Sequence, residues 1–433
     1  TNCKTKTGRW ALALSLSLFL SPAAAMEEAS KEENQQVLRV LEALKEASHE
    51  LQANPNPNSA ESNSSAVKAL LELETEADTI LSSDPYLSTL SHHLTNLKTI
   101  VDTLQRSRGH YGLRSFLTRR VSTHEISRVA GSIESEIQAW IDRESIENLI
   151  RALHRSDPPS SSFNEDDLTR ILDEFVNRLA QGFNRELQDL ILKSKVFSAL
   201  ESVLCGSNFS KKVRERAAFA IAELIRFNKD VFVGQVLMGK TIQALISMAS
   251  LSSFKVLCSL IKTIKSPLVD EIESNGEIPK IVNFLNAEDL SLRIMAMDCV
   301  VEIGYFGRKE AIDAMIKAEL VKKLVELQRS ELGGDLIDMG KFEVSGSGSG
   351  SGSGGVGMEG KGKRESKEKR FLESHPFASC VARFAVQLEV GEGLRQREKR
   401  EFKQEILKRV REASVSDAEA ATITAEVLWG SSP

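Results

Sequence analysis

A three-helix pattern recurs in the second half of this 433-residue chain, about once every 40 residues. Its opening segment occurs as DVFVGQVLMGKTI (230–242), SPLVDEIESNGEI (266–278) and KEAIDAMIKAELV (309–321), with a weaker copy in RELQDLILKSKVF (185–197). Apolar residues stand at matching places in these segments, with the spacing of a helix followed by a turn. Because one such unit cannot cover its own apolar face, the units must stack, and the pattern predicts an α-solenoid.

Two further helices are expected in each unit. The predicted second helices begin at Phe197, Ile242, Ile278 and Val321. The longer third helices are RERAAFAIAELI, FKVLCSLIKTI, LRIMAMDCVVEI and PFASCVARFAVQL. The repeats therefore occupy residues 185–330, and the last third helix follows an insertion. Residues 371–433 are predicted to hold that last repeat and the C-terminal helices that cap the solenoid.

The insertion at residues 331–370 combines a Gly/Ser tract, VSGSGSGSGSGGVG, with the basic run KGKRESKEKR. Gly and Ser favour a flexible chain, so we predict a disordered segment. The letters G-x-G-x-x-G inside the tract have no strand before them and no helix after them. They therefore do not indicate a dinucleotide site.

The first part of the chain reads as a separate helical domain. Residues 26–155 have helical apolar spacing, with helices predicted over 66–82, 86–105 and 122–154, which favours an N-terminal helical bundle. The arginine-rich stretch 106–120 is expected to be a solvated loop, with contact to an acidic partner or to a membrane as its alternative role. The segment SDPPSSSFNE then marks a boundary, so residues 156–184 are predicted to be a linker and a connecting helix.

Residues 1–25 have the layout of a secretory signal peptide, with basic residues, an apolar run from Trp10 to Leu20, and small residues at Ala23–Ala25. The chain starts with Thr, however, and Met26 opens a sequence typical of a soluble protein. Translated upstream sequence that is not part of the native protein is therefore the competing explanation. We predict a cytoplasmic location, with the nucleus as an additional one, and the secretory pathway if residues 1–25 are a genuine signal.

Charge and cysteine content argue against several classes of function. The 56 basic and 61 acidic side chains give a net charge of −5, which provides no general attraction to nucleic acid, and no nucleic-acid partner is expected. The five cysteines are far apart, with no C-x-x-C pair and no histidine cluster at the spacing of metal ligands, so no metal and no other cofactor is predicted. Cys205, Cys258, Cys299 and Cys380 lie in apolar helical segments and are expected to be buried, reduced thiols.

The stretch GQVLMGKT (234–241) matches the nucleotide-binding pattern G-x-x-x-x-G-K-S/T. A phosphate loop needs small residues between a buried strand and a helix, whereas Val236, Leu237 and Met238 are bulky and no parallel-sheet pattern occurs. The register of the repeats places the stretch in a first helix and its terminal turn, with Gly239 expected in the left-handed conformation. No nucleotide-binding residues are therefore predicted, and an NTPase is the disfavoured alternative.

The repeat unit resembles the armadillo repeat, through Asn228-Lys229, Gly276-Glu277-Ile278-Pro279 and the alanine-rich third helix that contains Ala217, Ala218 and Ala220. The tail that begins ESHPFASC, and the segment ISRVAGSIESEIQAWI, are similar to plant armadillo-repeat proteins whose helical N-terminal domain is shared with U-box ubiquitin ligases. The interval SDPPSSSFNEDDLTRILDEF has no room for a U-box and no Cys-Pro-Ile core, so ligase activity is not implied. The resemblance implies an all-α fold, with an N-terminal helical bundle followed by an armadillo-type α-solenoid.

A solenoid offers a long groove rather than a closed pocket, and no nucleophile–base set can be assembled from the sequence. We therefore predict a protein that is not an enzyme, but a scaffold that binds a partner segment in the concave groove lined by the third helices. The candidate groove residues are Phe219, Glu223, Thr263, Asp298, Glu302, Arg383 and Gln387. The Trp–Asn pairs with which importin-type armadillo proteins bind basic peptides are absent from the matching positions.

The carboxylates of the groove favour a basic or Ser/Thr-rich partner segment, or else they only keep an exposed face solvated. The alternative function is a substrate adaptor in ubiquitin or polar-growth signalling, by analogy with the relatives. Neither the identity of the partner nor the oligomeric state follows from the sequence.

Overall fold

The computed structural model describes residues 88–107, 113–154, 165–333 and 372–429, together with parts of the stretch 41–49. Every described element is a helix, and no strand occurs in these ranges. The chain divides into two compact units, Thr1–Glu147 with Arg185–Leu190, and Asn148–Asn184 with Ile191–Pro433. The predicted signal-like segment 1–25, the predicted helix 66–82 and nearly all of the insertion 331–370 lie outside the described residues.

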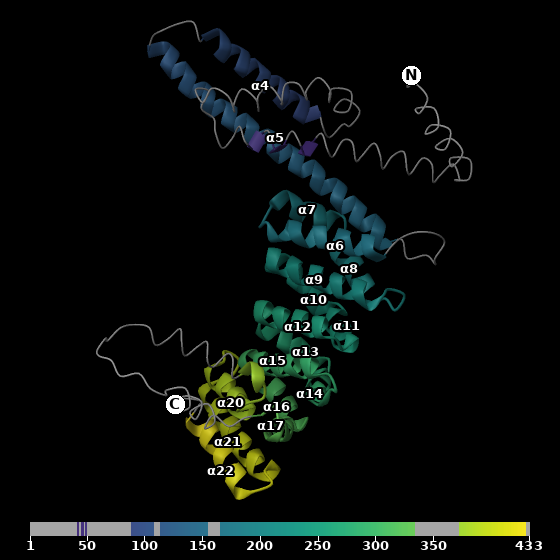
Figure 1. Cartoon of the computed structure of the whole chain (residues 1–433), viewed down its shortest axis with the longest axis vertical. Coiled ribbons are helices and arrows are strands. Elements are labelled where there is room, and N and C mark those ends of the chain that lie inside the picture. The colour runs from purple at the N-terminus through teal and green to yellow at the C-terminus, as the bar shows by residue number, and fades with distance from the viewer. Residues whose placement is uncertain are drawn as a thin grey trace, which may run out of the picture. The chain divides into compact units, whose positions relative to one another are not determined.

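Two long helices, α4 (Ser88–Ser107) and α5 (Leu113–His154), supply most of the described part of the first unit (Figure 1). Leu90 and Leu97 of α4 and Ile133 and Ile137 of α5 are fully buried, which is the amphipathic packing predicted for a helical bundle. The prediction of a loop over residues 106–120 was wrong in part, because α5 already begins at Leu113. Leucine and arginine are good helix formers, so the sequence LRSFLTRR extends the helix rather than the loop.

The second unit consists of stacked three-helix repeats, although residues Arg185–Leu190 of their earliest helix belong to the first unit (Figure 1). The first and second helices are α7 (Arg185–Lys193) and α8 (Val196–Cys205), α10 (Lys229–Met238) and α11 (Thr241–Met248), α13 (Ser266–Ser274) and α14 (Ile278–Asn283), and α16 (Lys309–Lys317) and α17 (Leu320–Arg329). A 3-10 turn, η1 (Phe284–Asn286), extends α14. The second helices begin within one residue of the predicted positions.

The third helices form a row in which each helix packs on the next. In order they are α6 (Glu165–Ala180), α9 (Lys211–Phe227), α12 (Leu251–Ile264), α15 (Leu290–Phe306) and α20 (Cys380–Val390). The helix α6, predicted from the sequence as a connecting helix, packs along α9, and its residues Leu168, Leu172 and Phe175 are buried. It therefore takes the place of a third helix ahead of the first complete repeat. The predicted all-α fold with an α-solenoid of stacked three-helix repeats is confirmed.

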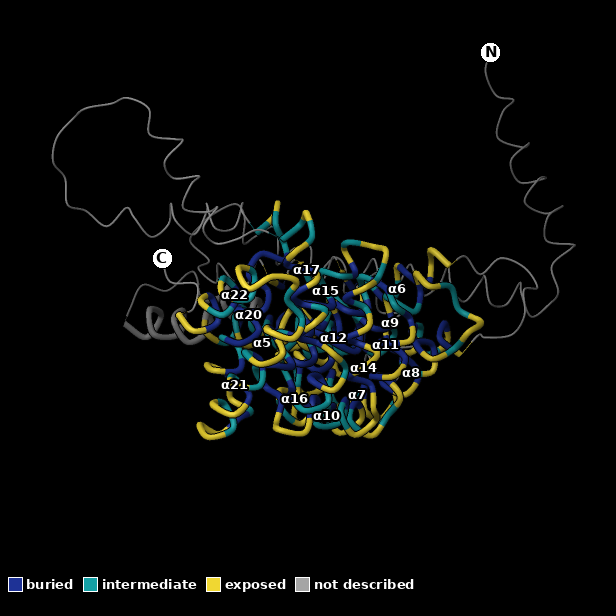
Figure 2. Tube along the Cα trace, turned by 90° about the horizontal axis from the view of Figure 1, so that it is seen from below, coloured by how far each residue is buried: buried dark blue, intermediate teal, exposed yellow. Residues whose placement is uncertain are grey.

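The apolar core runs through the stack from one repeat to the next, as the dark blue tube in Figure 2 shows. Phe232, Phe254, Phe377 and Phe384 are among its largest fully buried side chains. Each contributes roughly 1.5–3 kcal/mol by burial of its ring. The repeats therefore depend on each other for stability, as stacked units of this kind do.

Two helices, α21 (Gln396–Ala413) and α22 (Asp417–Trp429), close the C-terminal end of the solenoid. Arg329 of α17 holds Glu419 of α22 through two hydrogen bonds, at 2.8 and 3.1 Å. Deeper in the same contact, the carboxylate of Glu426 accepts hydrogen bonds from Gln328 Nε2 (2.9 Å) and from Ser379 Oγ (3.1 Å). All three of these side chains are buried, so the cap is fastened by a polar contact inside the core.

Within the described residues, no single helix is both long and apolar enough to cross a bilayer. The helices α10 and α11 are long and apolar enough only when they are counted together, and the chain bends by 69° between them.

Candidate binding face

The seven predicted groove residues all lie on third helices, and each is partly exposed. Phe219 and Glu223 lie on α9, Thr263 on α12, Asp298 and Glu302 on α15, and Arg383 and Gln387 on α20. Because residues four positions apart share one side of a helix, the two residues contributed by α9, α15 or α20 point to the same side. We call this set the third-helix face.

Ion pairs link α6 to α9 at the start of the row. Lys212 Nζ lies 2.8 Å from Asp166 Oδ1, and Arg216 Nη1 lies 3.2 Å from Asp173 Oδ1. All four side chains are well exposed, so each pair contributes little to stability. Their effect is to neutralise two of the carboxylates that α6 presents.

The carboxylates of Glu223 and Glu302 are also paired within the chain. Arg226 Nη1 lies 2.5 Å from Glu223 Oε1, and the same guanidinium donates to Ser259 Oγ on α12 at 2.9 Å. Lys262 of α12 lies 3.1 Å from Glu302 of α15. Two of the three carboxylates that favoured a basic partner are thus already neutralised by cations of this protein.

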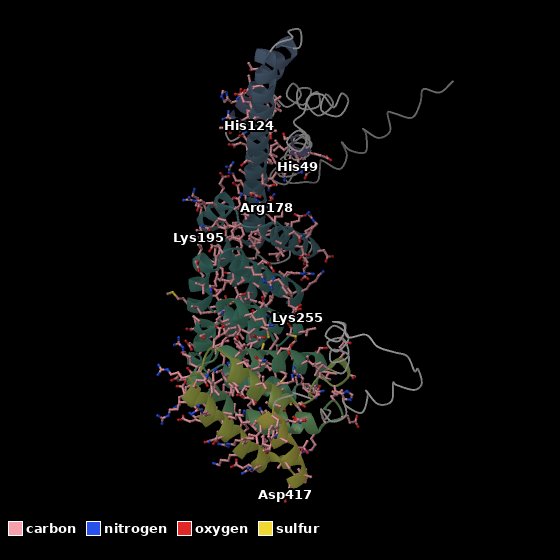
Figure 3. All side chains as sticks on the ribbon, turned by 90° about the vertical axis from the view of Figure 1, so that its left-hand side faces the viewer. His49, His124, Arg178, Lys195, Lys255 and Asp417 are labelled. Atoms are coloured by element: carbon pink, nitrogen blue, oxygen red, sulfur yellow. The ribbon has the colours of Figure 1, made fainter. Side chains whose placement is uncertain are left out.

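The lysines and arginines of the third helices therefore contribute to the charge of the face as much as its carboxylates do. Lys255, which is exposed on α12 one turn before Ser259, can be located in Figure 3. Neighbouring side chains across the row carry charges of opposite sign. The face is consequently of mixed charge rather than acidic.

Asp298 differs from the other carboxylates of the face. No described residue lies within hydrogen-bonding or ion-pairing distance of its carboxylate. Burial raises the pKa of Asp298 above its ordinary value, while the nearby cations Arg383 and Lys262 act in the opposite direction and Glu302 adds to the rise. The Arg383 guanidinium is turned to its own helix start, where Nη1 donates to the carbonyl oxygen of Pro376 at 2.8 Å.

The stretch that matches the nucleotide-binding pattern has a structural role in this fold. Its Gly234 lies inside α10, and its Gly239 ends that helix with φ −95° and ψ −170°. The prediction of a left-handed Gly239 was therefore wrong. The residue is small for a different reason, because a Cβ there would lie 2.3 Å from Glu201 Oε1 and 2.6 Å from the carbonyl oxygen of Gln235.

Glu201 of α8 occupies the place where a phosphate would have to bind. Its Oε1 accepts hydrogen bonds from the backbone N–H of Lys240 and from the hydroxyl of Thr241, both at 2.8 Å. The matching positions of the later second helices hold buried aliphatic residues, Ile246, Val282 and Val325. Glu201 was not among the predicted site residues, although alignment of the second helices shows it as the one charged residue at this position. The carboxylate uses the start of α11 for an internal contact between repeats.

We expect Glu201→Ala to lower the free energy of unfolding by about 1–3 kcal/mol, since it leaves the buried Thr241 hydroxyl and the Lys240 N–H without their acceptor. Urea unfolding followed by circular dichroism measures this loss. Lys240→Ala is the matched control, because Lys240 contacts Glu201 through its backbone and should unfold like the wild type. Equal losses from the two variants would contradict the assigned contact.

In the described ranges, the thiols and histidines do not assemble with acidic side chains into a group that could hold a metal ion. Cys258, Cys299 and Cys380 are buried as predicted, but Cys205 is exposed, because it ends α8 next to Gly206 at the edge of the stack. Partial burial and the nearby Glu201 raise the pKa of Cys205, so this thiol is not activated as a nucleophile. His49 and His124 can be found in Figure 3 on helices of the first unit.

No family model and no curated protein matches this chain. Among solved structures it is similar to a designed armadillo repeat protein, with 15% identity over 65% of this chain and 99% of that one and a TM-score of 0.38. A second designed armadillo repeat protein, in complex with the peptide (KR)4, has 16% identity over 66% of this chain and 99% of that one, with a TM-score of 0.39. The three-helix units and their packing, as described above, define the fold of this chain.

Proposed function

We propose that this protein is a non-catalytic scaffold that binds a segment of a partner protein along the third-helix face. The observation that carries the proposal is the row of seven partly exposed side chains on four successive third helices. A row of this kind can contact an extended or helical segment over several repeats. The ring of Phe219 supplies apolar area, and the side chains of Thr263 and Gln387 supply uncharged hydrogen-bonding groups.

The internal ion pairs change the expected partner. Since Glu223 and Glu302 are already paired, a strongly basic segment would have to displace Arg226 and Lys262 from them. We therefore favour a partner segment of low net charge over the basic one that the sequence favoured. Affinity for such a segment should depend weakly on salt, because few charges are exchanged on binding.

The test is a pull-down from an extract of the source organism with the full chain, read by mass spectrometry. The variant Phe219→Ala, Glu223→Lys, Glu302→Lys alters the third-helix face, and Glu288→Lys, Glu310→Lys adds the same charge at exposed positions away from it. We expect a partner that the wild type and the second variant retain and the first variant loses, with all three proteins folded by circular dichroism. Identical sets of partners from all three proteins would refute binding at this face.

Several finer predictions rest on the sequence resemblance alone. They are the plant origin, the relationship to U-box ligases, and an adaptor role in ubiquitin or polar-growth signalling. The cytoplasmic location stays a prediction from the character of the sequence after Met26. Membrane contact through the arginines of residues 106–120 also stays a prediction, since those side chains lie outside the described residues. Recovery of a ubiquitin-pathway protein in the pull-down would favour the adaptor role.

A further inference from the structure

The outer side of α22, the last described helix of the chain, is apolar. On its inner side, Ile423 and Val427 are buried in the second unit. The exposed residues on the opposite side are Ala418, Ala421, Ala425, Leu428 and Trp429. They recur at helical spacing and form one continuous stripe, which ends in two large side chains that are 50% and 80% exposed. We call these five residues the α22 face.

An apolar outer side distinguishes α22 from an ordinary surface helix, which turns charged residues to the water. The neighbouring helix α21 has such a charged surface, with Arg397, Glu401 and Lys408 exposed. The two glutamates of α22, Glu419 and Glu426, instead form hydrogen bonds within the second unit. A helix that is apolar all round is typically covered all round. The α22 face therefore indicates a surface that a further element covers.

The position of α22 in the fold shows which kind of contact the face suits. The helix α20 packs on both α15 and α22, so α22 continues the row of third helices by one more helix. It lies at the end of the stack in Figure 1, and Asp417 at its start marks that end in Figure 3. A unit that ends a helical stack normally has a polar outer side, which keeps the protein soluble. The α22 face is instead built like an internal step of the row, to which another helix can be added.

The opposite end of the row does not complement the α22 face. Its first helix, α6, exposes Asp166, Arg170 and Glu174 along one side. Head-to-tail stacking of one molecule on another would bury these charges against apolar side chains, which is unfavourable. A second α22 face is uncharged and of the same length. Two copies related by a twofold axis therefore match each other and form a closed dimer rather than a filament.

We propose that the α22 face binds the α22 face of a second copy of this chain, with the two helices antiparallel. The large side chains stand at one end of the face and the alanines occupy the rest. An antiparallel pair places Leu428 and Trp429 of each copy beside Ala418 of the other, and Ala421 opposite Ala425. The small alanine side chains let the two helices approach closely. This inference goes beyond the proposed function and does not depend on it.

The size of the face indicates a weak dimer. Its 13 residues make α22 about 20 Å long, and a helix is about 10 Å wide. Two such faces bury roughly 800 Å² in total, which is below the range of stable protein interfaces. We therefore expect a dissociation constant on the order of 100 μM. Because the contact is apolar, salt should not weaken it.

Sedimentation velocity of the full chain over a range of protein concentrations measures the association. We expect the wild type to shift from monomer to dimer as its concentration rises. Ala421→Glu should weaken the dimer about tenfold or more, because it places a charge at the centre of an apolar contact. Gln404→Glu is the matched control, since it adds the same charge to the exposed side of α21 and should associate as the wild type does. Both positions are exposed and glutamate favours helices, so circular dichroism should show all three proteins folded.

Mixtures of variants test the antiparallel pairing. Ala421→Glu and Ala425→Lys should each be monomeric alone, and their mixture should form a dimer, because the two new charges lie opposite each other and can pair. Ala421→Glu mixed with Ala421→Lys should recover less, since an antiparallel pair does not place these two positions opposite each other.

Three results would overturn the inference. The first is a wild type that stays monomeric at every concentration, which would leave the α22 face to a different partner or to another segment of this chain. The second is an Ala421→Glu protein that associates as strongly as the wild type, and the third is a mixture of Ala421→Glu and Ala425→Lys that remains monomeric. None of these results bears on the pull-down with the third-helix variants, so the proposed function can fail or hold separately.

Discussion

Phe384→Ala is expected to lower the free energy of unfolding by about 3–5 kcal/mol. The Phe384 ring is fully buried and lies against the backbone of α15 at Gly304, where an added Cβ would come within 3.0 Å of Phe384 Cε2. Loss of the ring leaves a cavity between the last two third helices. Because each repeat is stabilised by its neighbours, α20, α21 and α22 should then detach before the rest of the stack unfolds.

Two measurements check this prediction. Urea unfolding gives the loss of stability, and limited proteolysis followed by mass spectrometry shows whether cleavage concentrates after residue 372. Val390→Ala is the control, since Val390 lies on the same helix with its side chain 57% exposed. A Phe384→Ala protein as stable and as protease-resistant as Val390→Ala would show that α20 is not held by this ring.

Glu426→Leu is expected to cost about 2–3 kcal/mol, although it places an apolar side chain in an apolar core. The Glu426 carboxylate is the acceptor for Gln328 Nε2 and Ser379 Oγ, and both donors are buried. Replacement leaves these two groups without hydrogen bonds and without water. The cost should therefore come from the donors that remain rather than from the carboxylate that is removed.

The double variant Gln328→Leu, Glu426→Leu separates these contributions. If the orphaned donor causes the loss, removing Gln328 as well should recover part of it, so that the two effects are not additive. Thermal unfolding of the four proteins in the cycle measures the coupling. Additive losses would mean that Glu426 contributes independently of Gln328.

The periodic pattern of the sequence predicted most of the solenoid. A helix that buries one side must repeat apolar residues at helical spacing, and that requirement is local, so the four second helices could be located to within one residue. The helix α6 was harder to place, because its partner α9 lies beyond α7 and α8 in the chain. The start of α5 differs from the prediction because a run of arginines is typical of solvated loops but also favours helices.

The residues of the third-helix face could also be selected from the repeat, because helical position decides which side chains are left partly exposed. The ion pairs and hydrogen bonds of their charged side chains could not be predicted from the repeat. Arg226 and Ser259 are 33 residues apart, and Lys212 and Asp166 are 46 apart, so these contacts depend on how neighbouring helices align. The same holds for Glu201 and Lys240, which are 39 apart.

The sequence by itself determined that this chain forms stacked helical repeats, since the spacing of apolar residues within one helix is enough to require a neighbour. Only the tertiary structure decided which polar groups are satisfied inside the protein and which are left for a partner. In the structure, Glu201 accepts hydrogen bonds at the start of α11 and Glu302 pairs with Lys262. Asp298 has no partner among the described residues. The physical reason is that hydrogen bonds and ion pairs act over a few ångströms, and the register between packed helices sets those distances.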